Sequence, residues 1–231
     1  DNLHSFFLWG AVGLDRFVNY GADEIGPNRN FGRVEPTQAY FIDEGNVGSD
    51  EETNEIWEIL YKNVVNTNLI IEQVEGNENI DQTDRDQIIG QALFLRAMAF
   101  YHLTNLWGDV PFFTEVISNR EAGKLGETDR NQIRQTLISD MLRAQDLLPD
   151  SYPNAQQSRA TKWAAATLAT KIYLWQEQWQ NARDKAVEII NNSPHRLLEN
   201  YADVFDPNNE FNDEVIWSVD FVKDINNSNW V

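Results

Sequence analysis

The 231-residue sequence contains no cysteine and few basic residues. The lack of cysteine excludes disulfide bonds, thiolate metal sites and a cysteine nucleophile, although it leaves the redox compartment undecided. Lys and Arg together number 18 against 37 Asp and Glu, which gives a formal net charge of −19. Because a surface with this charge repels phosphate backbones, we expect no nucleic-acid partner.

Long apolar runs and histidines are also scarce. No run of about 18 apolar residues occurs, so we expect no helix that spans a bilayer. The three histidines, His4, His102 and His195, lie far apart and fit no metal-ligand spacing such as H-E-x-x-H.

One segment alternates oxygen-bearing side chains as a calcium loop does, at Asp206, Asn208, Glu210 and Asn212. It lacks the central glycine of such a loop, so we predict neither a metal nor a cofactor. Carboxylates are abundant along the chain, but no spacing singles out a pair for acid and base catalysis. We therefore predict no catalytic residues and no enzymatic activity.

Apolar and aromatic residues are plentiful. They make up 42% and 12% of the chain, which argues for a folded core rather than disorder. From Ile88 to Leu106 nearly every side of a helix would be apolar, as in a helix covered by other elements. This helix should end at Gly108, with Pro111 preventing its continuation. Arg96 lies inside the apolar run and must be paired to be buried.

Helical spacing of apolar residues recurs on both sides of this central helix. The helices that we expect cover 3–18, 53–75, 83–106, 128–148, 159–175 and 179–191. Those after residue 53 pair into hairpins of similar length, with a degenerate tetratricopeptide pattern at Thr170, Tyr173, Ala182 and Pro194. Residues 19–50 are irregular, and 214–221 alternate like a strand. We predict an all-α fold of tetratricopeptide-like helical hairpins with long irregular loops and little strand.

Several stretches resemble the SusD/RagB family of outer-membrane nutrient-binding lipoproteins of Bacteroidetes. They are WEILYKNVVNTNLIIEQV from Trp57, GQALFLRAMAFYHLTNLWGDVPFF from Gly90, ISDMLRAQDLLP from Ile138, and RATKWAAATLATKIYLWQEQWQNARDKAVEII from Arg159. The resemblance implies a single SusD-like domain over 1–231. Its parts would be an N-terminal helix and binding loop (1–52), helical hairpins (53–194) and the start of a less regular part (195–231). Members are longer, so we expect the domain to be incomplete here.

The resemblance also implies a function. Family members sit on the outer membrane through a lipid anchor on an N-terminal cysteine, which this chain lacks. They dock on a SusC-like TonB-dependent transporter and bind oligosaccharides or polysaccharides without cleaving them. Two other functional hypotheses stay open. One is a tetratricopeptide scaffold for protein tails, which the acidic surface disfavours, and the other is an α-helical carbohydrate-active enzyme.

We interpret the shared motif residues as structural: Arg96, Trp107, Gly108, Asp109, Pro111, Arg159 and Trp163. Sugar binding requires flat aromatic faces together with amides, carboxylates and guanidinium groups. The loop over 19–41 supplies that mixture, so we predict ligand contacts at Tyr20, Asp23, Asn28, Arg29, Asn30, Phe31, Arg33 and Tyr40. The alternative is that its aromatic residues pin the loop onto the helices.

Overall fold

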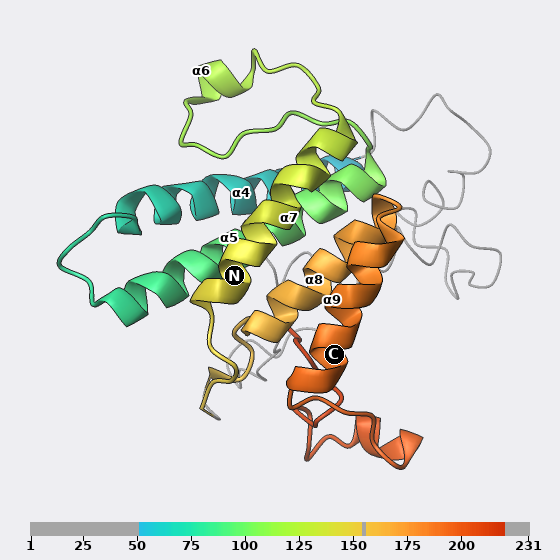
Figure 1. Ribbon diagram of the computed structural model, residues 1–231. Coiled ribbons are helices and arrows are strands. Elements are labelled where there is room, and N and C mark those ends of the chain that lie inside the picture. Colours follow the sequence, from blue (N-terminus) through green and yellow to red (C-terminus); the bar gives the residue numbers. More distant parts are fainter. Residues whose placement is uncertain (1–50, 154–155, 220–231) are drawn as a thin grey trace, which may run out of the picture. The chain divides into compact units, whose positions relative to one another are not determined.

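The computed structural model describes residues 51–153 and 156–219, and within them every regular element is a helix (Figure 1). The elements are α4 (Glu51–Val74), α5 (Gln82–Leu106), α6 (Asn119–Ala122), α7 (Arg130–Leu147), α8 (Lys162–Trp175), α9 (Trp179–Asn192) and the 3-10 helix η3 (Tyr201–Phe205). The described part of the chain confirms the all-α prediction. The expected helix at 3–18 and the loop after it lie outside these residues.

Val64–Ser218 form one compact unit, and the earlier turns of α4 belong to another. Within the compact unit each helix packs mainly on the next one along the chain: α5 on α7, α7 on α8, and α8 on α9. Helices α5 and α8 scarcely touch. Contacts restricted to sequence neighbours are typical of helical repeat arrays, as the tetratricopeptide-like pattern predicts.

Small side chains bring α8 close to its neighbours. Ala164, Ala165, Ala166 and Ala169 on α8 are all buried, as is Ala182 on α9. An alanine surface lets a second helix approach closely and leaves few voids. The alanine-rich run in the sequence therefore marks a helix whose small side chains are buried against its neighbours.

The central helix α5 is buried over most of its circumference. Leu93, Phe94, Ala97, Phe100 and Leu103 are each at most 1% exposed. Its N-cap is Asp81, whose side chain accepts a hydrogen bond from the backbone N–H of Thr83, so the helix begins at Gln82, one residue before the expected start at 83. The helix ends at Trp107, and Gly108 follows with φ +83°, the left-handed residue that the sequence predicts.

Two other boundaries differ from the sequence prediction. Helix α8 begins at Lys162 because Thr161 caps it through the backbone N–H of Ala164, so Arg159 and Ala160 precede the helix. Residues 214–219 form no strand in the described structure. Among the residues that the structure describes, no second strand lies beside them. Trp217 instead packs its ring against Phe94 and donates from Nε1 to the carbonyl of Ser158 at 3.0 Å.

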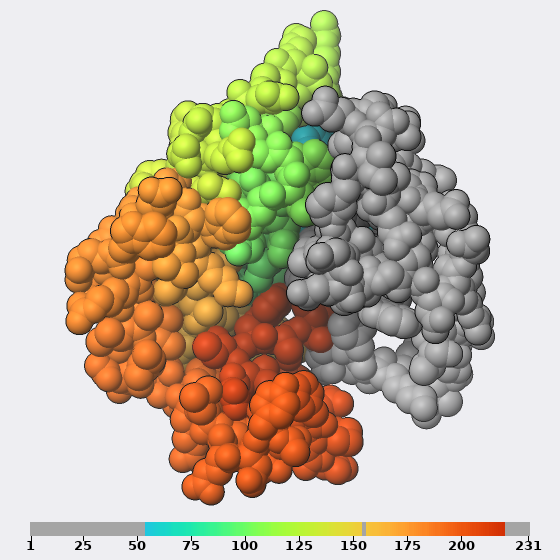
Figure 2. Space-filling model, turned by 90° about the vertical axis from the view of Figure 1, so that its right-hand side faces the viewer, coloured from blue at the N-terminus to red at the C-terminus, as the bar shows by residue number. Residues whose placement is uncertain are grey.

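The connection between α5 and α7 projects from the helices of this unit and carries the short helix α6 (Figures 1 and 2). Ser118 and Glu121 cap α6 reciprocally, so its helical turn does not depend on packing. The segment after α9 lies at the opposite end of the helices from this projection (Figures 1 and 2). None of the helices in the described residues is long and apolar enough to cross a membrane.

Candidate functional site

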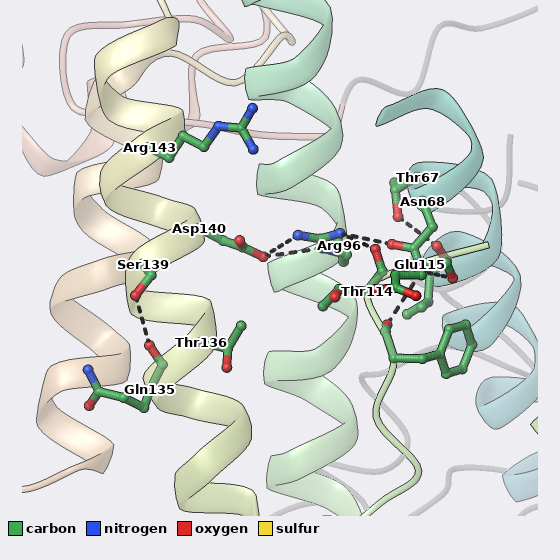
Figure 3. Close-up of polar contacts among 12 residues, drawn as sticks. Thr67, Asn68, Arg96, Thr114, Glu115, Gln135, Thr136, Ser139, Asp140 and Arg143 are labelled. Atoms are coloured by element: carbon green, nitrogen blue, oxygen red, sulfur yellow. Dashed lines mark hydrogen bonds and ion pairs between the residues drawn. The ribbon is translucent and has the colours of Figure 1, made fainter. Parts of the chain in front are cut away.

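Arg96 is the centre of a buried polar network (Figure 3). Its Nη2 lies 2.7 Å from Asp140 Oδ2 on α7, and its Nε donates to the same oxygen at 3.2 Å. Its Nη1 donates to Asn68 Oδ1 on α4 at 2.9 Å and to the carbonyl of Thr114 at 3.2 Å. Burial raises the pKa of Asp140, and the nearby Arg96 opposes that shift. Every nitrogen of the guanidinium is paired, so the charge joins three segments.

Asn68 extends this network to the projecting connection. Its Nδ2 donates to the carbonyl of Glu115 at 3.1 Å and to that of Phe113 at 3.4 Å (Figure 3). Together with the bond from Arg96 to Thr114, these contacts hold three consecutive carbonyls at the base of the connection. The network therefore positions a loop without presenting any charge to a ligand.

The corner after α5 contacts the first turn of α7. Asp109 Oδ1 accepts from the backbone N–H of Arg130 at 3.0 Å and from its Nε at 3.2 Å. These bonds lower the pKa of Asp109. A Cβ on Gly108 would lie 2.8 Å from Nη2 of Arg130, so the guanidinium occupies the space that the missing side chain leaves. The corner acts as a helix cap for its neighbour.

The remaining motif residues also lie among helix contacts. Trp163 is 3% exposed on α8, with the ammonium of Lys162 4.8 Å from its ring centroid. Arg159 lies over the ring of Tyr152 at 5.7 Å, and Tyr152 accepts from Gln91 on α5 at 2.9 Å. The backbone N–H of Trp107 bonds back to the carbonyl of Leu103. These residues contact neighbouring helical segments, and their structural role stays a prediction.

The eight residues predicted to contact a ligand lie outside the described residues: Tyr20, Asp23, Asn28, Arg29, Asn30, Phe31, Arg33 and Tyr40. Within the described ranges no three His, Asp or Glu side chains gather as a metal site would require. The alternating segment at 206–212 forms turns, in which Asp206 Oδ1 accepts from the backbone N–H of Asn208 and Asn212 donates to the carbonyl of Val204.

A surface that the sequence did not predict lies where α5 ends, α7 begins and α8 ends. We call it the Trp175 surface, and it comprises Tyr101, Asn105, Arg134 and Trp175. The Trp175 ring is 54% exposed, and its Nε1 donates to the Tyr101 hydroxyl at 3.2 Å. The Arg134 guanidinium carbon lies 5.3 Å from the Trp175 ring centroid, and Nη2 donates to Asn105 Oδ1 at 2.9 Å.

Burial lowers the pKa of two basic groups at and beside the Trp175 surface. Arg134 is 5% exposed, and burial lowers its pKa. Neighbouring His102 has a pKa lowered to about 4, first by burial and second by the charge of Lys171. Tyr101 and Asn105 are four residues apart and so share one helix face. This spacing is the one sequence signal for the surface, because it places Tyr101 and Asn105 side by side. Nothing in the sequence indicates that Trp175 and Arg134 contact these two residues.

Comparison with known proteins identifies the family. A SusD-like family model, described as "Starch-binding associating with outer membrane", matches residues 27–174. The chain is 43% identical over 221 residues to SusD-like protein P25 of Formosa agariphila, an alignment that covers 94% of this chain and 42% of the relative.

Solved structures show the same fold. A SusD-like protein from Bacteroides fragilis superimposes with a TM-score of 0.69 at 23% identity, covering 75% of this chain and 35% of that one. Surface glycan-binding protein A from Bacteroides thetaiotaomicron, in complex with laminarihexaose, has a TM-score of 0.62 at 20% identity, covering 70% and 34%. The chain thus spans less than half the length of each of these relatives. The family-model match over 27–174 and the 43% identity to the Formosa agariphila relative show that this chain belongs to the SusD-like family.

Proposed function

We propose that this chain belongs to a surface glycan-binding protein that captures oligosaccharides and passes them, uncleaved, to a SusC-like TonB-dependent transporter in the outer membrane. The observation that carries the proposal is the family match over 27–174, whose description names both starch binding and the outer membrane. A structural relative bound to laminarihexaose supports a glycan as the ligand. We further propose that a lipid anchor, on a cysteine outside this sequence, attaches the protein to the membrane.

The described helices suit a scaffold. The buried Arg96 is fully paired with neighbouring segments, and Asp109 pairs with Arg130 at the start of α7. A rigid array of this kind can hold an irregular loop in place, and binding residues commonly occur on such loops. We therefore keep the residues predicted from Tyr20 to Tyr40 as the proposed ligand contacts.

Affinity electrophoresis of the 231-residue chain in gels containing neutral and acidic polysaccharides tests glycan capture. We expect retarded migration in at least one polysaccharide and no release of reducing ends on incubation with it. Retention in none of them, or steady release of reducing ends, would contradict the proposal. Co-purification with a SusC-like transporter from the source organism tests delivery, and a transporter that purifies without this protein under mild detergent would argue against it.

The loop is tested by removing its aromatic faces. Tyr20→Ala and Tyr40→Ala should each weaken glycan binding about tenfold, since an aromatic contact of roughly 1.4 kcal/mol corresponds to that factor. Tyr201→Ala is the matched control because Tyr201 is 80% exposed and lies on η3. Equal affinities for all three variants would place the ligand contacts elsewhere.

A further inference from the structure

Arg134 is a buried charge with an incomplete set of partners. It is 5% exposed, yet only Nη2 has a hydrogen-bond acceptor among the described residues. Nε is enclosed without a partner. No carboxylate of the described chain lies within ion-pair distance, although the chain carries 37 Asp and Glu in total. A buried guanidinium is ordinarily paired with an anion, so this one lacks the group that would neutralise it.

The surroundings of Arg134 favour an anion from outside the protein. The charge of Asp129 acts on Arg134 from a distance, but the Asp129 carboxylate accepts hydrogen bonds from the backbone N–H groups of Asn131 and Gln132, and Asp109 pairs with Arg130. Arg130 adds a second positive charge near Arg134.

The Trp175 ring supplies a place for a sugar next to that charge. It covers the Arg134 guanidinium at 5.3 Å and remains 54% exposed. Its Nε1 bond to the Tyr101 hydroxyl fixes the plane of the ring, and Gln176 Nε2 anchors the end of α8 to the carbonyl of Asn131 at 2.7 Å. Apolar faces of pyranose rings pack on exposed indoles held in this way.

We propose that the Trp175 surface binds an acidic sugar residue of a glycan, with the pyranose ring on Trp175 and its carboxylate or sulfate group accepting hydrogen bonds from Arg134. The inference rests on the proposed function, because it names the class of glycan that this protein captures. Guanidinium groups bind carboxylates and sulfates through charge-assisted hydrogen bonds, which are about twice as strong as neutral ones. A neutral sugar would leave the buried Arg134 charge without an anionic partner.

The test compares the binding of four polysaccharides by calorimetry or affinity electrophoresis. They are polyglucuronate as the carboxylate, dextran sulfate as the sulfate ester, and laminarin and dextran as neutral probes. We expect the wild-type chain to bind one acidic probe at least tenfold more tightly than either neutral probe, with an affinity that falls as salt rises. Which acidic probe binds distinguishes a uronate from a sulfate ester.

Asn105→Asp is the most informative variant because it supplies Arg134 with an internal carboxylate at the position of an existing 2.9 Å hydrogen bond. The protein should stay folded, and the affinity for the acidic probe should fall about tenfold or more. Arg134→Gln should lower it similarly. Arg183→Gln changes the net charge equally on the exposed face of α9 and should have no effect.

The outcomes separate this inference from the proposed function. Preference for neutral probes, or unchanged acidic binding in both Asn105→Asp and Arg134→Gln, overturns the inference and leaves glycan capture standing. Binding to no glycan overturns both. Thermal melts of each variant show whether it is folded, and Asn105→Asp answers the question if Arg134→Gln does not fold.

Discussion

Two arginines, Arg96 and Arg134, are each 5% exposed, but their surroundings differ completely. Arg96 has a carboxylate, an amide oxygen and a carbonyl as acceptors. Arg134 has one amide oxygen and an indole face. Burial alone therefore does not distinguish a structural charge from a binding charge. The acceptors do, because a fully paired guanidinium has nothing left to offer a ligand.

The largest effect should come from breaking the paired arginine. Arg96→Met leaves Asp140 buried without its partner and releases Asn68 and the connection at Thr114. We expect a loss of about 3–5 kcal/mol in the free energy of unfolding, measured by urea denaturation. Arg143→Met removes the exposed pair with Glu75 and should cost at most about 1 kcal/mol. Similar losses in both variants would show that the buried network does not hold the helices.

Lowering the pH should reduce the free energy of unfolding through His102, which lies beside the Trp175 surface. His102 has a pKa of about 4 when folded against 6.5 when unfolded, so between these values only the unfolded chain binds the proton. Stability present above pH 6.5 is therefore lost as the pH falls towards 4. The contribution is about 1–3 kcal/mol. His102→Gln should flatten this part of the stability profile, whereas His195→Gln should not. A profile unchanged by His102→Gln would contradict the assignment.

A substitution at Gly108, in the corner after α5, should have a smaller effect on the stability of the fold. Gly108→Ala places a Cβ at φ +83° and 2.8 Å from the Arg130 guanidinium. We expect a cost of about 1 kcal/mol, mostly from the backbone conformation, because the Arg130 side chain can move. Gly126→Ala, with nothing within 4 Å of the added carbon, should be neutral. Thermal denaturation of the two variants compares them directly.

The smallest effect on stability should come from removing the unpaired arginine. Arg134→Met keeps an apolar stem against Trp175 and removes a charge that lacks an anion. We expect a change of less than about 1 kcal/mol in either direction, measured by urea denaturation beside Arg96→Met. A loss as large as that of Arg96→Met would mean that Arg134 is structural, and the contrast between the two would fail.

The sequence predicted the fold far better than the site. Three features depend on local spacing, and each appears in the structure as expected. They are the apolar residues on nearly every side of α5, the end of that helix before Gly108, and the closely spaced alanines of α8. The expected starts of two helices, at 83 and 159, were misplaced. Several nearby residues can cap a helix, and the choice among them depends on backbone geometry. The alternation at 214–219 predicted a strand because periodicity does not reveal whether a partner strand exists.

The Trp175 surface was missed for a different reason. Its residues come from three helices, and Tyr101 and Trp175 are 74 positions apart in the chain. Spacing rules describe one element at a time, so they assign Tyr101 to a helix face but cannot join that face to the end of α8. The loop residues from Tyr20 to Tyr40 remain a prediction, since they lie outside the described residues.

The connection between α5 and α7 is fastened at its base, and just beyond the base it has open space at Gly126. Thr128 bonds to Val110 across the base, and Asn68 and Arg96 hold the carbonyls of residues 113–115. A Cβ at Gly126 would meet nothing within 4 Å. A break in the backbone at Gly126 would therefore leave two fragments that still share the α5–α7 packing. This position suits a split protein, whose two fragments should reassemble on mixing, and it can carry an inserted label without disturbing the helices.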